Sequence, residues 1–179
     1  MPKYVAFLRA INVGGHNVKM DQLRQLFEAL GFAQVETFIA SGNVIFDSTS
    51  KSVRDLEVQI EDHLHAKLGY KVATFIRSTT ELADIAHYEP FPDSDLNTEG
   101  GILYIGFMAG KPSEKAIQKL LSLSTDIDDF HLNGREVYWQ CRTRFSDSKF
   151  SGPLLEKTLG IPATLRNSTT VKKIAAKYA

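Results

Sequence analysis

Residues 68–80 read LGYKVATFIRSTT, and residues 159–170 read LGIPATLRNSTT. Both segments contain Leu-Gly, then Ala-Thr, then an arginine shortly before Ser-Thr-Thr, and a tyrosine follows ten residues after each shared serine, at Tyr88 and Tyr178. Outside these segments, the turn-like residues 38–43 (FIASGN) return as residues 130–135 (FHLNGR). These matches lie between 89 and 92 residues apart, so the sequence indicates one structural unit that was duplicated and fused.

Composition places the chain among ordinary globular proteins. Its 179 residues are 43% hydrophobic and 23% charged, and its apolar runs are only a few residues long, against about 20 for a membrane-spanning helix. Tyr4–Leu8 is too short for a signal segment. A single cysteine, Cys141, excludes an intramolecular disulfide and favours a reducing compartment. We therefore expect a cytoplasmic protein without membrane contact.

Charge is unevenly distributed along the chain. Residues 1–134 hold 12 Lys/Arg and 18 Asp/Glu, whereas residues 135–179 hold 9 and 3, which gives −6 and +6. A basic C-terminal part could meet an anionic partner. Because its basic residues are dispersed, two solvated surfaces that attract one another are the favoured interpretation.

The first copy predicts the order β-α-β-β-α-β, the split βαβ arrangement of a ferredoxin-like sandwich. Apolar spacing from Leu23 to Leu30 and a start at Ser52 with a stop at Gly69 indicate its two helices. Its predicted strands are Tyr4–Arg9, Val35–Ala40, Val44–Asp47 and Val72–Arg77.

The second copy repeats this order after a helix near Thr80–His87. Pro112 suits the first turn of its first helix, and Asn133-Gly134 is the strongest hairpin signal in the chain. Its predicted strands are Ile102–Met108, Asp129–Leu132, Glu136–Gln140 and Ala163–Arg166, with helices at Pro153–Leu159 and at the C-terminus. We predict an α+β fold of two tandem ferredoxin-like units, residues 1–78 and 101–179, joined by residues 79–100.

In the first strand of each copy, the residues that point to one face and those that point to the other are both apolar. This pattern is typical of strands buried on both sides. Helices cover only one face of a ferredoxin-like sheet. The partner repeat or a second subunit is therefore expected to cover the other, and a homodimer is one of these two alternatives.

The two copies differ most between the first strand and the first helix. Fifteen residues separate Leu8 from Leu23, but nine separate Met108 from Ile117, so the first copy carries six extra residues within 12–19. A scaffold that folds without this segment in one copy does not need it in the other, which makes it a candidate for acquired function. Gly14 and Gly15 permit close backbone approach, and the loop leads to a helix N-terminus that favours anions.

This loop and the second turn of the first copy are expected at the same edge of the sheet. Strand geometry predicts Asn12 and Asn43 on the order of 10 Å apart. The predicted site binds a small anionic or polar ligand, including phosphate-bearing or nucleotide-like ones, through Arg9, Asn12, Gly14, Gly15, Lys19, Ser41 and Asn43. The alternative is a structural Gly-Gly loop with Asx-turns.

Arg166 and Asn167 form a second polar cluster and a further candidate for ligand binding. Ser168 or Thr169 could cap the final helix, which would explain the hydroxyl groups without a ligand. Arg77 occupies the place of Arg166 in the first copy, so a shared structural role remains an equal alternative.

No known catalytic or cofactor motif is present. The glycine loop matches neither the dinucleotide fingerprint nor the P-loop, and Ser41 lacks a nucleophile-elbow context. His63 and His65 are two apart on a predicted helix and face different ways, which disfavours a shared metal. Cys141 is expected to be buried and inert. The sequence therefore assigns no metal, no cofactor and no catalytic residue, and an enzyme of unknown reaction stays an open class.

Single-stranded RNA binding is the main alternative function, because RNA-recognition modules share this topology and stack bases on sheet aromatics. Tyr138 and Trp139 are the only candidates for such a stacking surface. Residues 41–47 do not match the basic-aromatic signature of such modules, and strands apolar on both faces suggest a covered sheet.

The segment from Leu8 to Gly15, then Lys19-Met20, Leu30-Gly31-Phe32 and Ile39 to Val44, closely resembles the bacterial family called domain of unknown function 1697. Leu159-Gly160 and Thr164 to Val171 resemble the closing motif of that family, with Ser168 and Thr169 where Trp and Asn are common. The resemblance implies a cytoplasmic bacterial protein with a ferredoxin-like α+β fold and assigns no activity.

Overall fold

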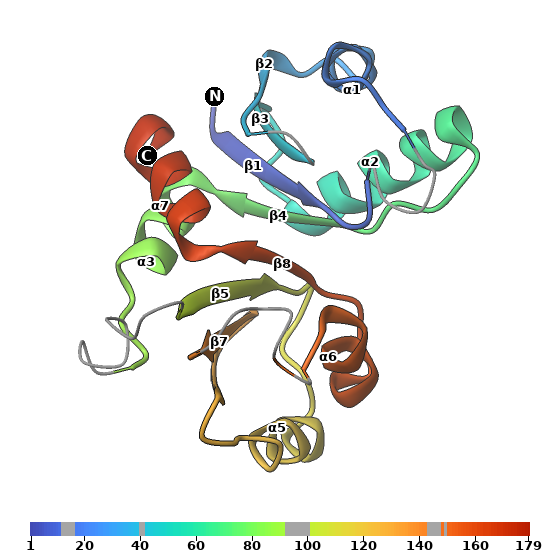
Figure 1. Ribbon diagram of the computed structural model, residues 1–179. Helices are drawn as coiled ribbons and strands as arrows, with labels where there is room; N and C mark the ends of the chain where they lie inside the picture. Colours follow the sequence, from blue (N-terminus) through green and yellow to red (C-terminus); the bar gives the residue numbers. More distant parts are fainter. Residues whose placement is uncertain (12–16, 40–41, 92–100, 143–147, 149) are drawn as a thin grey trace. The chain divides into compact units, whose positions relative to one another are not determined.

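The computed structural model describes residues 1–11, 17–39, 42–91, 101–142, 148 and 150–179. Each half of the chain contains strands and helices, and in each half two strands follow one another directly (Figure 1). Their bounds are β1 Lys3–Leu8, α1 Met20–Glu28, β2 Ala33–Thr37, β3 Asn43–Asp47, α2 Val53–Leu68, β4 Thr74–Ser78, α3 Thr79–His87, β5 Ile102–Phe107, α5 Glu114–Leu121, β6 Asp128–Asn133, β7 Glu136–Cys141, α6 Gly152–Leu159, β8 Thr164–Asn167 and α7 Ser168–Tyr178. Among the described helices, none is long and apolar enough to cross a bilayer.

The chain divides into two compact units. The first comprises Met1–Leu82 together with Tyr178–Ala179, and the second comprises Ala83–Lys177. Tyr178 is joined to the first unit by its hydroxyl, which donates to Glu36 Oε2 at 2.7 Å, and by its ring, which meets Phe38 edge-on. The last residues of the chain therefore contribute to the unit that the first residues build.

Each unit contains a four-stranded antiparallel sheet. The order is β2-β3-β1-β4 in the first unit and β6-β7-β5-β8 in the second. Strand β3 lies between β1 and β2, as predicted, and β7 takes the same position between β5 and β6. The fold is therefore α+β, with the same strand order in both units.

Helices α1 and α2 cover one face of the first sheet (Figure 1). Tyr4, Ala6 and Leu8 of β1 point toward them, because alternate side chains of a strand share a face. Phe46 of β3 is fully buried there and stacks on Phe32 with ring centroids 4.4 Å apart. This aromatic layer anchors both helices to the sheet.

The second unit has a core of the same kind. Trp139 of β7 is fully buried, stacks on Tyr104 at 4.9 Å and meets Phe150 edge-on. Its indole N–H donates to Asp128 Oδ1 at 2.8 Å, and the Ser148 hydroxyl donates to the same carboxylate. The buried carboxylate thus has partners, and the network fixes the orientation of the large ring.

The opposite faces of the two sheets are also buried, as the sequence predicted. Val5 and Phe7 in β1 are fully buried, and Ile105 and Phe107 in β5 are at most 2% exposed. In the second unit, the Tyr138 hydroxyl on this face donates to the carbonyl of Ile85 in α3. The end of α3 therefore packs over the second sheet.

Local signals placed most helix ends correctly. Ser52 caps α2 by accepting from Asp55 N–H, and Gly69 ends it with φ +84°. The prediction for Pro112 is wrong: Ser113 caps α5, so Pro112 precedes the helix. A serine at N-cap satisfies a first-turn N–H, which Pro112 cannot do, and this moves the helix start beyond the proline.

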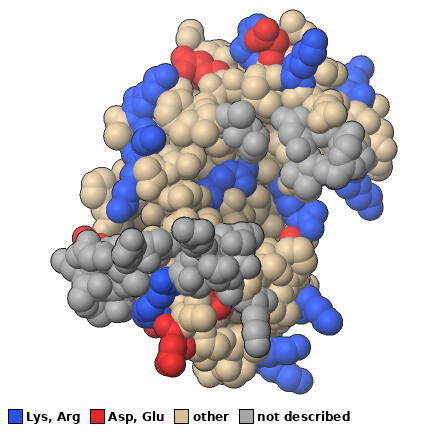
Figure 2. Space-filling model, viewed as in Figure 1, with Lys and Arg blue, Asp and Glu red and all other residues tan. Residues whose placement is uncertain are grey.

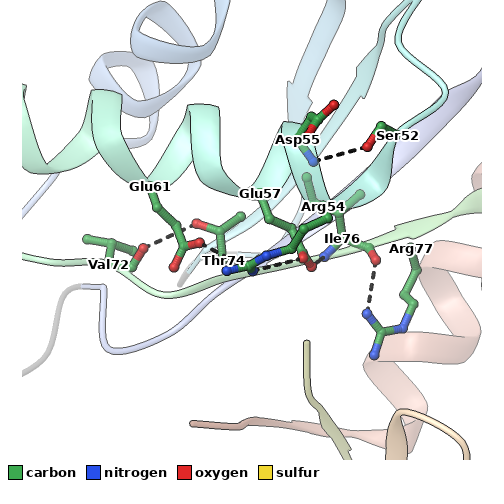
Figure 3. A network of polar contacts seen from close by, with 9 residues as sticks. All are labelled: Ser52, Arg54, Asp55, Glu57, Glu61, Val72, Thr74, Ile76 and Arg77. Carbon is green, nitrogen blue, oxygen red and sulfur yellow. Dashed lines mark hydrogen bonds and ion pairs between the residues drawn. The ribbon is translucent and has the colours of Figure 1, made fainter. Parts of the chain in front are cut away.

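Strand β4 is an edge strand of the first sheet, and its unpaired edge is covered by acidic side chains of α2 (Figure 3). Glu57 is 1% exposed, and its Oε2 accepts from Ile76 N–H at 2.9 Å. The backbone N–H of Thr74, two residues earlier, donates to Glu61, one helical turn after Glu57. Because these carboxylates occupy the outward N–H groups, the edge cannot pair with another strand there.

Arg54 balances this charge. Its Nη1 lies 3.4 Å from Glu57 Oε1 and 3.9 Å from Glu61 Oε1 (Figure 3). Burial raises the pKa of Glu61 above its usual value, against the opposing effects of Arg54 and the Thr74 N–H, and the charges of Glu57 and Asp62 raise it further.

Glu57→Ala should lower the free energy of unfolding by about 1–3 kcal/mol, because Ile76 N–H would be left buried without its acceptor. Glu57→Gln keeps one acceptor oxygen and should cost less. Asp62→Ala, at an exposed position of the same helix, is the control and should stay within about 0.5 kcal/mol of the parent. Urea unfolding measures all three, and equal losses in the Ala and Gln variants would contradict the role of the acceptor.

Glu61 should make stability depend on pH. A raised folded-state pKa contributes stability that is fully present below the unfolded value of 4.5 and is lost as pH rises through the folded value. Glu61→Gln keeps an acceptor for Thr74 but cannot ionise. The parent should therefore lose stability relative to this variant as pH rises above 4.5 in denaturant titrations. A constant difference across that range would show that Glu61 does not titrate abnormally.

Candidate functional site

The end of β1 and the β2–β3 turn meet through backbone atoms at one edge of the first sheet. Leu8 N–H donates to Gly42 O at 2.9 Å. Gly42 has φ +86°, and a Cβ atom there would lie 2.7 Å from Ile11 Cγ2 and 3.1 Å from Leu8 Cβ. Only glycine fits this contact, so the end of β1 and the β2–β3 turn pack closely against each other here.

Several predicted site residues adjoin this contact. Asn12, Gly14, Gly15 and Ser41 lie outside the described residues, as does the predicted spacing of Asn12 and Asn43. Their described neighbours Ile11 and Gly42 are the residues that approach each other.

Arg9 and Lys19 flank the glycine loop. The Arg9 backbone N–H donates to Ala73 O at 2.9 Å, which ties the strand exit to the segment before β4. Lys19 is exposed and is the N-cap residue of α1, with extended backbone angles and no side-chain cap hydrogen bond.

The start of α1 differs from three other helix starts. Ser52, Ser113 and Ser151 each accept a first-turn N–H at the starts of α2, α5 and α6. At α1 the cap side chain does not, and Asp21 is the acidic residue of its first turn. Amide groups at such a start can donate to an oxygen-bearing ligand.

Asn43 holds the turn itself. It is 3% exposed, and its Nδ2 donates to the carbonyls of Phe38 and Ile39, both at 3.1 Å. Ile39 has φ +51°, a left-handed conformation that these bonds help to hold. The Asn43 amide nitrogen therefore already has two acceptors within the turn, and these bonds stabilise the turn.

The Arg166–Asn167 cluster is built into β8 and α7. Arg166 Nη1 donates to Leu165 O at 3.0 Å and to Thr164 Oγ1 at 2.7 Å. In the first unit Arg77 Nη1 donates to Ile76 O at 2.9 Å, so both arginines bond the carbonyl of the residue before them. This match is what a shared structural role predicts. Burial lowers the pKa of Arg166 to about 10, which still leaves it protonated at neutral pH.

The predicted cap of the last helix is wrong. Asn167 Oδ1 accepts from Thr169 N–H at 2.9 Å, so Asn167, and not Ser168 or Thr169, supplies the capping oxygen. An Asn side chain reaches the N–H two residues ahead as readily as a serine does, which the sequence pattern could not distinguish.

The proposed RNA platform is not accessible. Tyr138 is 1% exposed and Trp139 is fully buried, so neither ring can stack on a base. On the face shown in Figure 2, Lys and Arg side chains lie in separate groups and not in one continuous patch. Within the described residues, no cluster of His, Cys, Asp and Glu could hold a metal ion. Cys141 is buried, as expected.

The sequence did not predict a cavity of about 140 Å³ in the second unit. It lies beside the end of α3, over the face of the sheet that carries Ile105 and Tyr138. Its lining residues come from four separate parts of the chain, and the one local signal was the cluster of ring-bearing residues from His87 to Phe91.

Comparisons with known proteins agree with the fold and leave the chemistry open. The model of a family described as "Protein of unknown function (DUF1697)" matches residues 1–138. No curated protein matches the chain. A solved structure of a conserved bacterial protein from Streptococcus pneumoniae is similar, with a TM-score of 0.78 and 24% identity, over 99% of this chain and 98% of that chain. At that identity the likeness shows the fold alone.

Gly42→Ala should lower the free energy of unfolding by about 2–4 kcal/mol, because it adds a close contact to an unfavourable φ. Gly31→Ala is the matched control: its φ is +89°, but a Cβ atom there meets nothing within 4 Å. It should cost about 1–2 kcal/mol from the backbone alone. Equal losses in urea unfolding would show that the contact with Ile11 is not tight.

Proposed function

This chain belongs to the DUF1697 family, whose function is unknown, and we propose that it binds a small anionic or polar ligand, including nucleotide-like ones, at the edge where β1 and the β2–β3 turn meet. The contributing residues of the proposal are Arg9, Asn12, Gly14, Gly15, Lys19, Ser41 and Asn43, with Arg166 and Asn167 as a separate candidate cluster.

The backbone contact between Gly42 and the end of β1 carries this proposal. It brings Leu8 and Ile11 against the turn that follows β2. Asn12 and Ser41 are the direct neighbours of Ile11 and Gly42 in the sequence. Asn43 contributes by holding the turn, through its bonds to Phe38 and Ile39.

The start of α1 supplies the ligand chemistry. First-turn amides that no cap side chain bonds are donors for oxygen atoms, and the helix dipole favours a negative group by about 0.3–1 kcal/mol. Lys19 adds a positive charge beside them, and Asp21 opposes it. A singly charged or small phosphate-bearing ligand suits this balance better than a polyanion.

RNA binding and catalysis have less support than ligand binding at this edge. The burial of Tyr138 and Trp139 removes the surface that made RNA binding attractive, and no set of described residues supplies an acid-base pair for a named reaction.

The finer points of architecture are part of the same proposal. The strand orders β2-β3-β1-β4 and β6-β7-β5-β8 support two tandem ferredoxin-like units, residues 1–78 and 101–179, with residues 79–100 between them. We place the protein in the cytoplasm, since its single cysteine suits a reducing compartment, and we keep a homodimer as a further proposal.

Replacing Gly14 and Gly15 by valine should abolish ligand binding and leave the melting temperature of the free protein nearly unchanged, because the second copy lacks this segment. A thermal-shift screen against phosphate, nucleotides and sugar phosphates is the measurement. A ligand at about 100 times its Kd adds roughly 2.7 kcal/mol to the apparent stability of the parent, which such a screen detects.

Lys19→Gln is the milder companion, and Lys51→Gln, another exposed lysine of the first unit, is its control. The first should weaken binding and the second should not. A large loss of stability in the valine variant would return the loop to a structural role, and a flat response of the parent to every compound would refute the site.

A further inference from the structure

The cavity of the second unit has the size of one aromatic ring. Its volume is about 140 Å³. An apolar protein cavity of about 150 Å³ is large enough to bind benzene. Its lining includes Ala86, Tyr88, Phe91, Tyr138, Ser168 and Lys172.

Two tyrosines form an aromatic wall. The rings of Tyr88 and Tyr138 lie 5.2 Å apart between centroids. Their hydroxyl groups already have partners: Tyr138 donates to Ile85 O at 3.2 Å, and Tyr88 lies 2.6 Å from His131 Nε2. The rings are thus held in place, and both residues line the cavity together with Phe91. Tyr88 is 36% exposed and offers its ring, whereas Tyr138 is 1% exposed and packs behind it. A flat ring packs well against such surfaces.

Donors gather on the α7 side of the cavity. Ser168 and Lys172 are one helical turn apart and both line it. Lys172 is exposed and makes no ion pair with any residue that the structure describes. Ser168 begins α7, where the positive end of the helix dipole adds to the lysine charge.

The acceptors of the cavity are weaker. His87 Nδ1 lies 2.7 Å from Ala83 O and therefore carries a proton, which leaves Nε2 as an acceptor when the ring is neutral. Glu89 is exposed, and it is the single carboxylate of the lining. A ligand anion is favoured over a cation because the lysine, the hydroxyl and the helix start lie on one element.

We propose that this cavity binds a monocyclic aromatic carboxylate, with the ring against the exposed side chain of Tyr88 and the carboxylate at Lys172. This site shares no residue with the glycine-loop edge, so either can fail without the other.

Benzoate is the probe, measured on the full chain by ligand-observed NMR titration. We expect saturable binding with a Kd on the order of 1 mM or tighter, as suits so small a ligand. Benzamide and benzylamine have the same ring with a neutral or a positive group, and both should bind more weakly. Equal binding of benzamide, or stronger binding of benzylamine through Glu89, would overturn the assignment of an anion.

Lys172→Gln should weaken benzoate binding by about tenfold, since it removes a charge-assisted hydrogen bond. Lys173→Gln, at the next and also exposed position of α7, is the matched control and should leave the Kd unchanged. Ala86→Leu should fill the cavity and abolish binding, and thermal melting checks that this variant folds. Identical Kd values for the two lysine variants, or no saturable binding to the parent, would refute the site.

Discussion

The burial of the central strand β1 on both faces is the constraint on which the first unit depends. Tyr4 to Leu8 are at most 4% exposed, and both edges of the strand are paired, with β3 and with β4. A strand so enclosed cannot offer side chains to a ligand along its length. Polar chemistry is confined to the points where the chain leaves the sheet, and the contact of Gly42 with Leu8 and Ile11 fixes one such point. The same reasoning explains why the outer edge at β4 needs Glu57 and Glu61: a buried N–H must find an acceptor, and no strand supplies it.

Comparison of the two copies separates scaffold from specialisation. Tyr4 pairs with Phe46 on the neighbouring strand of the first sheet, and Tyr104 pairs with Trp139 in the same way in the second. Arg77 and Arg166 each donate a hydrogen bond to the carbonyl of the preceding residue. Tyr88 bonds His131 in the second unit, and Tyr178 bonds Glu36 in the first. These features recur because the fold requires them. The glycine loop of the first copy has no counterpart in the sequence of the second, which makes it the better candidate for function.

Much of the fold could be predicted because its signals are local. Ser52, Gly69 and Gly134 act within a few residues of the helix end or turn that they specify, and the strand predictions fell within a few residues of the observed bounds. The errors arose where several local solutions compete, as when Ser113 displaced Pro112 and Asn167 displaced Ser168 as cap. Contacts between distant residues gave no pattern to read. Glu57 and Ile76, for example, are 19 residues apart. The two hydrogen bonds of the Asn43 amide are local, but they depend on the left-handed backbone of Ile39, which its residue type does not indicate.

The two proposed sites recognise ligands by different means, and this bears on how they can change. At the edge of the first sheet, backbone amides and glycines would make contacts beside the charge of Lys19, so the loss of glycine would be the most damaging change there. In the cavity of the second unit, the proposed contacts come from the side chains of Tyr88 and Lys172, and the Tyr138 hydroxyl is bonded to Ile85. Substitution of Lys172 would change which ligand charge the cavity prefers. It would not disturb the fold, because the Lys172 ammonium group makes no ion pair among the described residues. A duplicated scaffold can therefore keep one site fixed in its backbone while the other site diverges through single side chains.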